Sequence, residues 1–246
     1  MQPAPRILAV DTATRCCSVA IRAGGRLAAE TTVVSEQTHS IHLMRMIRET
    51  LRMAELDLPL IDGFAVAIGP GSFTGLRIGI STVQGLAFAG GKPCAGVSSL
   101  EALASGCLPW PHGICALMDA RKGEVYVGWY RDGGGRLEPL APERVLPLEE
   151  ALQPMNAPQL FVGDGAERLR ERIRTMLGGL AEFAPPERSL ARAGRVARLA
   201  QPLLAAGQGV DPQLLSPRYL RASDAERHLH RGRAGNAREV PESFHP

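Results

Sequence analysis

The stretch Ile68-Gly-Pro-Gly-Ser-Phe-Thr-Gly-Leu-Arg-Ile-Gly-Ile-Ser81 decides the fold of this chain. The apolar run at 64–68 that leads into it has the length and alternation of a buried strand. Residues 69–71 break this strand, and Ser72 stands where the N-cap of a helix is expected. A strand, a glycine turn and a helix therefore follow one another, and such a turn allows backbone to approach a phosphate or another chain closely.

Two phosphate-binding motifs were compared with this turn. A P-loop requires Gly-Lys followed by Ser or Thr, whereas Gly75 is followed by Leu76, so that motif is absent. A dinucleotide fingerprint requires a third glycine, where this chain has Thr74, and an acidic residue about 20 positions further on. The next expected strand, at 93–97, ends in serines instead, and we set the dinucleotide motif aside.

Composition sets broad limits on the fold and the function. The chain has 246 residues, of which 45% are hydrophobic, enough for a core in one large or two small domains. The net charge is +3, and only Lys92 and Lys122 among the 28 cationic residues are lysines. This uniform use of arginine indicates compositional bias, so composition alone does not argue for nucleic-acid binding.

The five cysteines show no metal-ligand spacing, and we expect them to be reduced and mostly buried. The N-terminus lacks the apolar run of a signal peptide, and no stretch of about 18 apolar residues is present. We therefore expect a soluble, cytoplasmic protein without a membrane partner.

The first half of the chain predicts the element order βββαβαβ. Ser35 is the expected N-cap of the first helix, and the Gly24-Gly25 pair the expected hairpin turn. The strands are predicted at 6–10, 16–22, 27–34, 64–68 and 93–97, and the helices at 36–56 and 72–89.

The second half repeats this scheme. Strands are predicted at 114–118, 124–131, 137–146 (a weak one) and 159–162, and helices at 148–152, 166–177 and 190–206. Asp11 and Asp119 end the first strand of each half, and the glycine turns at 69–71 and 163–165 take the same later position.

This repetition predicts an α/β fold with a duplicated βββαβα unit and two small lobes that enclose a cleft. We expect an N-terminal lobe at 1–103 and a smaller C-terminal lobe at 104–222, whose last segment packs back on the body. The polar stretch 223–246 is expected to be a disordered tail.

The two helices of the first half carry more apolar surface than one sheet can cover. The apolar arc of the first spans about 180°, whereas a helix on one sheet needs little more than about 100°. The second has only a narrow polar strip, and its two glycines four residues apart would let another helix approach. A central core helix is the alternative interpretation of the second helix, and we prefer the hypothesis that both helices form a partner-docking surface. Its predicted residues are Leu43, Met44, Met46, Ile47, Leu51, Met53, Gly75, Leu76, Arg77, Gly79, Ile80 and Val83.

Several of these motifs resemble the bacterial TsaB (YeaZ) family. The similarity covers roughly residues 6–222, and the block at 69–79 is its most specific part. The other matching stretches are Leu8-Ala-Val-Asp-Thr-Ala-Thr14, Val97-Ser-Ser-Leu-Glu-Ala-Leu103, Asp119-Ala-Arg-Lys-Gly-Glu-Val-Tyr126 and Tyr219-Leu-Arg221. The resemblance implies the fold of actin-like and sugar-kinase ATPases.

The resemblance also implies a function in making threonylcarbamoyladenosine on tRNA, next to the anticodon. In that family TsaB is a non-catalytic subunit, and the paralogue TsaD holds the metal and transfers the threonylcarbamoyl group. TsaE is the ATPase, and TsaC makes the adenylate donor. The implied partners are TsaD, TsaE through the TsaD complex, a second copy of the chain when alone, and tRNA indirectly. No cofactor of its own is implied, and ATP and a metal are expected on the partner subunits.

Nucleotide binding by this chain alone is expected to be weak or absent. Kinases of this fold use a strand-end aspartate and glycine hairpins around phosphates, whereas no glycine follows Asp11 closely and Asp164 places a negative charge in the later turn. A nucleotide held jointly with TsaD remains open. The candidate residues are Asp11, Thr12, Asp119, Gly163 and Gly165.

No catalytic or metal-binding residue is predicted. His39 and His42 lie three residues apart, but TsaD's metal pair has a His-x-x-x-His spacing, and we predict two solvent-facing histidines. Ser72 is assigned to the helix cap, with no His and acid placed to activate it. A free-standing ATPase or small-molecule kinase that uses Asp11 and Asp119 is the alternative, and a homodimeric scaffold without RNA is a third possibility. The arginines at 45, 48, 52 and 77 are either RNA contacts or solvated charges.

Overall fold

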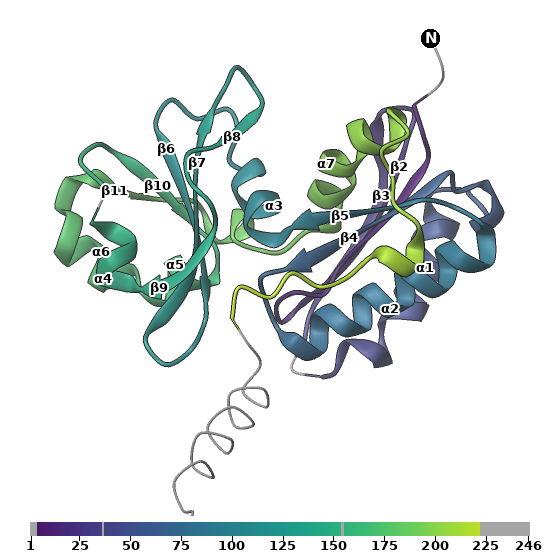
Figure 1. Ribbon diagram of the computed structural model, residues 1–246, viewed down its shortest axis with the longest axis horizontal. Coiled ribbons are helices and arrows are strands. Elements are labelled where there is room, and N and C mark those ends of the chain that lie inside the picture. Colours follow the sequence, from purple (N-terminus) through teal and green to yellow (C-terminus); the bar gives the residue numbers. More distant parts are fainter. Residues whose placement is uncertain (1–3, 36, 154, 222–246) are drawn as a thin grey trace, which may run out of the picture.

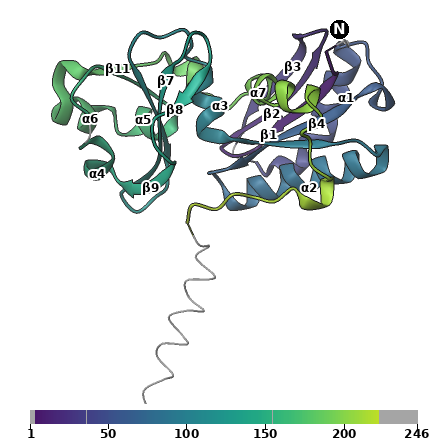
Figure 2. The same cartoon turned by 45° about the horizontal axis from the view of Figure 1, so that its top comes forward.

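The computed structural model describes residues 4–35, 37–153 and 155–221, which form two α/β lobes side by side (Figure 1). The stretch 223–246, predicted to be a disordered tail, lies outside the described residues. Each lobe contains one mixed sheet, and helix α3 (Ser99–Ser105) lies at the junction between them (Figure 2).

The first sheet has the strand order β3-β2-β1-β4-β5. The first three strands are antiparallel, and β4 and β5 continue the sheet in parallel from β1, with Val10 opposite Val66. Strand β1 is buried at every position, so it forms the centre of the lobe. The strands are β1 (Ile7–Asp11), β2 (Cys16–Ala23), β3 (Arg26–Val34), β4 (Gly63–Gly69) and β5 (Cys94–Ser98).

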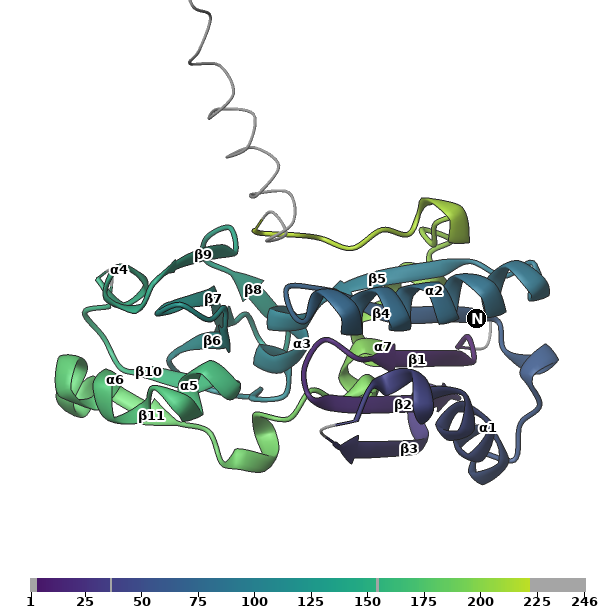
Figure 3. The same cartoon turned by 90° about the horizontal axis from the view of Figure 1, so that it is seen from below.

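Three helices cover this sheet. Helices α1 (Leu43–Met53) and α2 (Phe73–Gly90) lie on one face, and α7 (Ala193–Ala205) lies on the other (Figures 1 and 3). Helix α2 begins as predicted, because the hydroxyl of Ser72 accepts a hydrogen bond from the Gly75 amide at 3.2 Å. The short 3-10 helices η1 (His39–Ile41) and η2 (Leu58–Leu60) flank α1.

The second sheet repeats the arrangement with the order β11-β10-β6-β7-β8, and β9 also pairs with β7. Strand β6 is antiparallel to β7 and parallel to β10, as β1 is to β2 and β4. Its strands are β6 (Gly113–Asp119), β7 (Glu124–Asp132), β8 (Leu137–Pro139), β9 (Arg144–Pro147), β10 (Gln159–Val162) and β11 (Ala181–Phe183). The predicted α/β fold with a duplicated βββαβα unit is confirmed.

The second lobe has short helices. They are α4 (Leu148–Leu152), α5 (Asp164–Arg168), α6 (Arg170–Leu177) and the 3-10 helices η3 (Gly178–Leu180) and η4 (Pro186–Arg188). The helix predicted at 166–177 is in fact two helices, because Leu169 leaves helical geometry with φ −103° and ψ 12°. Strand β11 and helix α3 carried no clear pattern and were not predicted.

The prediction for the start of the first helix is wrong. Helix α1 begins at Leu43, and Ser35 does not cap it; the Ser35 hydroxyl accepts a hydrogen bond from the Gln37 amide instead. The reason is His39, which is 8% exposed and whose Nε2 hydrogen-bonds to the Thr14 carbonyl at 2.7 Å. This bond ties the segment before α1 to the β1–β2 loop.

The C-terminal part of the chain returns to the first lobe. Helix α7 packs on the first sheet, and the 3-10 helix η5 (Pro212–Leu214) packs on α2. The last segment therefore packs back on the body as expected, but α7 belongs spatially to the N-terminal lobe and not to the C-terminal lobe predicted at 104–222.

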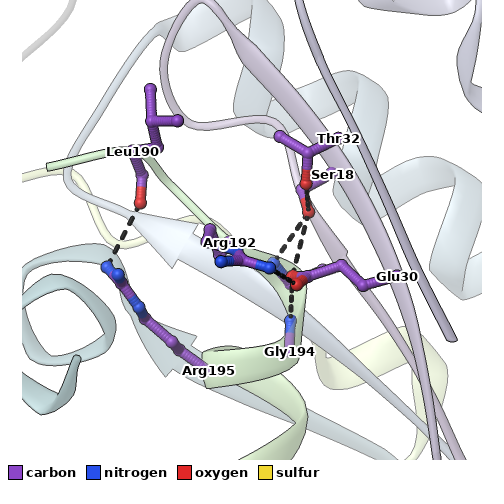
Figure 4. Close-up of polar contacts among 8 residues, drawn as sticks. Ser18, Glu30, Thr32, Leu190, Arg192, Gly194 and Arg195 are labelled. Carbon is purple, nitrogen blue, oxygen red and sulfur yellow. Dashed lines mark hydrogen bonds and ion pairs between the residues drawn. The ribbon is translucent and has the colours of Figure 1, made fainter. Parts of the chain in front are cut away.

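The N-cap residue of α7, Arg192, makes no side-chain cap hydrogen bond. Side chains of the first sheet cap the helix instead. The Ala193 amide donates to the hydroxyl of Ser18 on β2 at 3.0 Å, and the Gly194 amide donates to the carboxylate of Glu30 on β3 at 2.8 Å (Figure 4). Glu30 also pairs with Arg192. Acceptors at a helix N-terminus satisfy amides that have no partner within the helix.

All five cysteines are unpaired and buried, as predicted, and burial raises the pKa of Cys17 to about 11. Within the described part of the chain, no helix has the length and apolarity that a membrane span requires.

Candidate functional site

A cleft of about 590 Å³ lies between the two lobes. Its first-lobe walls come from the β1–β2 loop, the segment before α1 and the start of α2. The second lobe contributes the end of β6, the β6–β7 turn and the start of α5, and two C-terminal residues complete the lining. Its charged residues are Arg15, Asp119, Arg121, Asp164 and Arg221, and His39 lies beside them in the lining.

Asp119 is the one predicted nucleotide candidate that lines the cleft. One carboxylate oxygen accepts a hydrogen bond from the Arg121 amide at 2.9 Å, and the other pairs with Arg168. The Asp119 amide donates to the carboxylate of Asp164 at 3.3 Å. The Asp119 carboxylate is thus already held by a cation and an amide of its own lobe.

Asp11 lies beneath the floor of the cleft. It is 1% exposed, and its carboxylate accepts a hydrogen bond from the Ala13 amide at 3.0 Å. Burial raises the pKa of Asp11 to about 6, because the charged form loses its hydration. Asp11 is not among the residues that line the cleft.

Thr12 and the glycines of α2 pack against each other. The Thr12 hydroxyl donates to the Gly75 carbonyl at 2.8 Å, and Thr12 is fully buried. A Cβ atom at Gly75 would lie 2.1 Å from the Thr12 carbonyl oxygen, and one at Gly79 would lie 2.3 Å from the Thr12 hydroxyl. Gly75 and Gly79 therefore admit the β1–β2 loop, and the prediction that they admit a second helix is corrected.

Gly163 and Gly165 are also engaged in packing. Both are buried, and Cβ atoms there would lie 2.2 Å and 2.9 Å from the backbone of Leu117 and Met118 on β6. Gly163 has φ +108°, a conformation that favours glycine. The geometry of these glycines thus brings α5 onto β6, and neither residue lines the cleft.

Most of the predicted docking residues belong to the core of the first lobe. They are 8% exposed or less because the sheet beneath α1 and α2 covers them: Leu43, Met46, Ile47, Leu51, Leu76, Ile80 and Val83. These residues cannot contact a partner from where they lie, so the predicted surface is corrected to the exposed positions of the same helices.

The exposed positions form a smaller apolar set. Met44 and Met53 on α1 are 52% and 50% exposed, and Arg77 on α2 is also exposed. Sequence reasoning missed Ile41 on η1 and Phe88 at the end of α2, which are 64% and 66% exposed. Large apolar side chains that remain exposed in the folded chain indicate an interaction surface. From the sequence, only the apolar character of these two residues was visible.

The predicted solvent exposure of the two histidines is wrong for His39. It is buried against the β1–β2 loop, while His42 is partly exposed and hydrogen-bonds to the Gln37 side chain at 2.8 Å. In the described ranges, no three His, Cys, Asp or Glu side chains are grouped so that they could hold a metal ion.

Most residues of the cleft wall were not predicted, among them Arg15, Arg121, Tyr219 and Arg221. Arg121 lies in the β6–β7 turn with φ +61°, a strained conformation for a residue other than glycine. Tyr219 and Arg221 come from the far end of the chain, so only tertiary structure brings them to the cleft. The Tyr-Leu-Arg motif near the C-terminus marked them as part of the family resemblance, but not as part of a cleft.

Comparisons with known proteins agree on the family. A family model described as TsaD: tRNA N6-adenosine threonylcarbamoyltransferase matches residues 32–229. The tRNA threonylcarbamoyladenosine biosynthesis protein TsaB of Bacillus subtilis is 31% identical over 223 residues, which cover 89% of this chain and 96% of that protein.

Solved structures agree as well. YeaZ from Pseudomonas aeruginosa superposes with a TM-score of 0.78 at 35% identity, covering 88% of this chain and 100% of that one. Component A of the (R)-2-hydroxyglutaryl-CoA dehydratase of Acidaminococcus fermentans shares the fold alone, with a TM-score of 0.52 at 12% identity over 82% of this chain and 99% of that one. The fold is thus that of the actin-like ATPases, and the chain belongs to the TsaB (YeaZ) family of tRNA threonylcarbamoyladenosine biosynthesis proteins.

Proposed function

We propose that this chain is a non-catalytic assembly subunit for threonylcarbamoyl transfer to the adenine next to the tRNA anticodon, and that it acts by dimerising with the catalytic paralogue TsaD. Family membership supports the place in tRNA threonylcarbamoyladenosine biosynthesis. The observation that supports a non-catalytic subunit is the packing of the β1–β2 loop against α2.

In a kinase of this fold, backbone amides of such a loop surround a phosphate. Here the Ala13 amide donates to Asp11, and the Cys16 amide donates to the Thr14 hydroxyl at 3.0 Å. The Ala13 carbonyl accepts from the Ser72 amide at 2.7 Å. The loop is thus bonded within the first lobe, and Thr12 is fully buried beneath α2.

The exposed residues of α1 and α2 support docking on a related lobe. Met44 and Met53 are exposed on α1 and Phe88 is exposed on α2. The two helices lie on the same face of the sheet (Figure 3). Methionine side chains adapt to varied apolar surfaces. We assign this face to TsaD, or to a second copy of the chain when TsaD is absent; TsaE and tRNA reach the chain through TsaD, and ATP and a metal stay on the partner subunits.

Reconstitution tests this function. Purified TsaD, TsaE, the donor synthase TsaC, ATP and unmodified tRNA are incubated with and without this chain, and threonylcarbamoyladenosine is measured by mass spectrometry. We expect modification only when the chain is present. We also expect Asp11→Asn, which keeps a hydrogen-bond acceptor for the Ala13 amide, to support modification fully. An Asp11→Asn chain that assembles with TsaD yet gives no product would contradict a non-catalytic subunit.

The alternative is a free-standing ATPase or small-molecule kinase. The volume of the cleft and the presence of Asp119 in its wall favour this alternative. It predicts ATP turnover by the pure chain, which Asp119→Asn would abolish. No turnover above that of the Asp119→Asn chain would exclude it.

A further inference from the structure

The last described segment, 211–221, runs along α2 and then across to the second lobe (Figure 3). We call these residues the strap. On the first lobe, the side-chain amide of Gln84 donates to the carbonyls of Pro212 and Leu215 at 3.0 Å and 2.9 Å. The Arg218 amide donates to the Ile68 carbonyl at 2.8 Å, at the end of β4. The strap is therefore bonded to the first lobe along most of its length.

The strap also binds the second lobe through two arginines. The Arg218 guanidinium pairs with the carboxylate of Glu143 at 3.0 Å, and the Glu143 side chain is only 8% exposed. The same carboxylate accepts a hydrogen bond from the Tyr130 hydroxyl at 2.6 Å and another from the hydroxyl of Ser98, at the end of β5 in the first lobe. Glu143 thus joins the strap, β7 and β5 at one point.

The second arginine, Arg221, follows at the end of the strap. Its guanidinium donates to the Ala120 carbonyl at 2.7 Å and pairs with Glu124, both at the β6–β7 turn. The Arg221 side chain is 13% exposed. Charged side chains that are largely removed from water depend strongly on their partners, so Glu143 and Arg221 tie the strap to the second lobe, whereas the Arg218 side chain is 44% exposed.

Between these arginines, Tyr219 stacks on Phe73 at the first position of α2. The ring centroids are 5.0 Å apart with an angle of 22° between the planes. The Tyr219 hydroxyl accepts a hydrogen bond from Arg77 at 3.2 Å, and the Arg77 guanidinium lies 3.9 Å from the centre of the Phe73 ring. Tyr219 and Arg221 both line the cleft, so the strap forms part of its wall.

The chain itself crosses between the lobes at two other places, the segment between α3 and β6 and the segment between β11 and α7. No residue of either crossing lines the cleft. Two crossings away from the cleft are suited to act as a hinge. Helix α3 packs on both lobes at the same side, so the contacts of the strap at the cleft wall add to this packing in setting the angle between the lobes.

We infer that the strap is a clamp that holds the two lobes closed through Arg218, Tyr219 and Arg221, and that its release opens the interlobe cleft. The contacts of Arg218, Tyr219 and Arg221 are ion pairs, one aromatic stack and a few hydrogen bonds, without a covalent link. Leu215, which is 6% exposed in the core of the first lobe, anchors the other end of the strap. Release of the clamp therefore requires no unfolding of either lobe.

Spin labels measure this opening in the full chain. Labels are attached to cysteines introduced at Ser81 on α2 and Glu150 on α4, both exposed, because the five native cysteines are buried and leave the label no other site. Double electron–electron resonance then gives the distance distribution between the lobes. We expect the Arg218→Ala/Tyr219→Ala variant to shift this distribution to longer distances and to broaden it.

Two controls separate the clamp from general loosening. Gln213→Ala changes an exposed strap residue, and Tyr219→Phe keeps the ring stack, so both are expected to retain the distribution of the parent chain. Circular dichroism checks the fold of each variant. If the Arg218→Ala/Tyr219→Ala variant does not fold, Glu143→Gln takes its place. We expect Glu143→Gln to broaden the distance distribution to a smaller extent. An unchanged distribution in a folded clamp variant, or equal broadening in Gln213→Ala, would overturn the inference.

Discussion

The hydroxyl of Thr12 donates a hydrogen bond to the carbonyl oxygen of Gly75, 2.8 Å away, and so joins the loop after β1 to the first turn of α2. This contact requires two features of the sequence at once, a small hydroxyl residue after β1 and glycine on the facing side of α2. The effect of α2 glycines on stability is therefore the first quantity to measure.

We predict that Gly75→Ala lowers the free energy of unfolding by about 1–3 kcal/mol, because the new methyl group would lie 2.1 Å from the Thr12 carbonyl and the loop would have to move. Gly85→Ala on the same helix is the matched control. It meets no atom within 4 Å, and removing a glycine from a helix interior should raise stability by about 0.5–1 kcal/mol. Urea denaturation measures both, and equal effects would contradict the role of Gly75.

A second prediction concerns pH. Burial raises the pKa of Asp11 to about 6, above the ordinary value of 3.8 that applies in the unfolded chain. Between pH 3.8 and about 6 the unfolded chain ionises first, so the contribution of Asp11 to stability is complete below this window and falls as the pH rises through it. Asp11→Asn should remove this fall, which is worth about 3 kcal/mol at most.

The measurement is the free energy of unfolding of both chains at pH 4 and at pH 7. The free energy of unfolding of the Asp11→Asn chain, relative to that of the parent chain, should be higher at pH 7 than at pH 4. A constant difference between the two chains across the range would show that Asp11 has an ordinary pKa.

A third prediction concerns the cap of α7. The Glu30 side chain is 5% exposed, accepts a hydrogen bond from the Gly194 amide and pairs with Arg192 (Figure 4). Glu30→Ala removes both interactions. We expect a loss of about 1.5–3 kcal/mol in the free energy of unfolding. Glu49→Ala, which breaks a pair with Arg52 on the surface of α1, should cost about 0.5 kcal/mol or less. Similar losses in the two variants would mean that Glu30 does not cap α7.

The fourth prediction tests the docking face. Met44→Glu combined with Met53→Glu places charge on the exposed side of α1 without disturbing the core, and should weaken the complex with TsaD at least about tenfold if that face is covered. Met176→Glu changes a methionine that is 44% exposed on the second lobe and should leave the affinity unchanged. Titration calorimetry compares the three chains, and an unchanged affinity of the double variant would exclude α1 from the interface.

The local elements followed from the sequence where short-range signals decide them. Ser72 caps α2 as predicted, because a hydroxyl residue after a glycine turn is adjacent to the amides that it satisfies. Ser35 has the same residue type but does not cap α1. The difference is the contact between His39 and the Thr14 carbonyl, which joins residues 25 positions apart and leaves no pattern near Ser35.

The candidate site was less predictable than the fold. The strand-end position of Asp119 was enough to place it at the cleft, whereas Asp11 at the equivalent position is buried beneath it. The apolar arcs of α1 and α2 indicated large buried surfaces correctly. They could not show that the chain's own sheet covers Leu51 and Ile80, since the same residues suit a core or an interface.

The sequence by itself determined the duplicated α/β fold and most of its helices and strands along the chain, because alternation, glycine turns and caps act over a few residues, and its motifs already resembled the TsaB (YeaZ) family. Only the tertiary structure decided what the glycines of α2 contact, which helix residues stay exposed and that Tyr219 and Arg221 line the cleft. Those outcomes depend on contacts between segments that are distant in the chain, such as Tyr219 with Phe73. Burial and partner choice at such contacts are properties of the folded packing, and no local pattern encodes them.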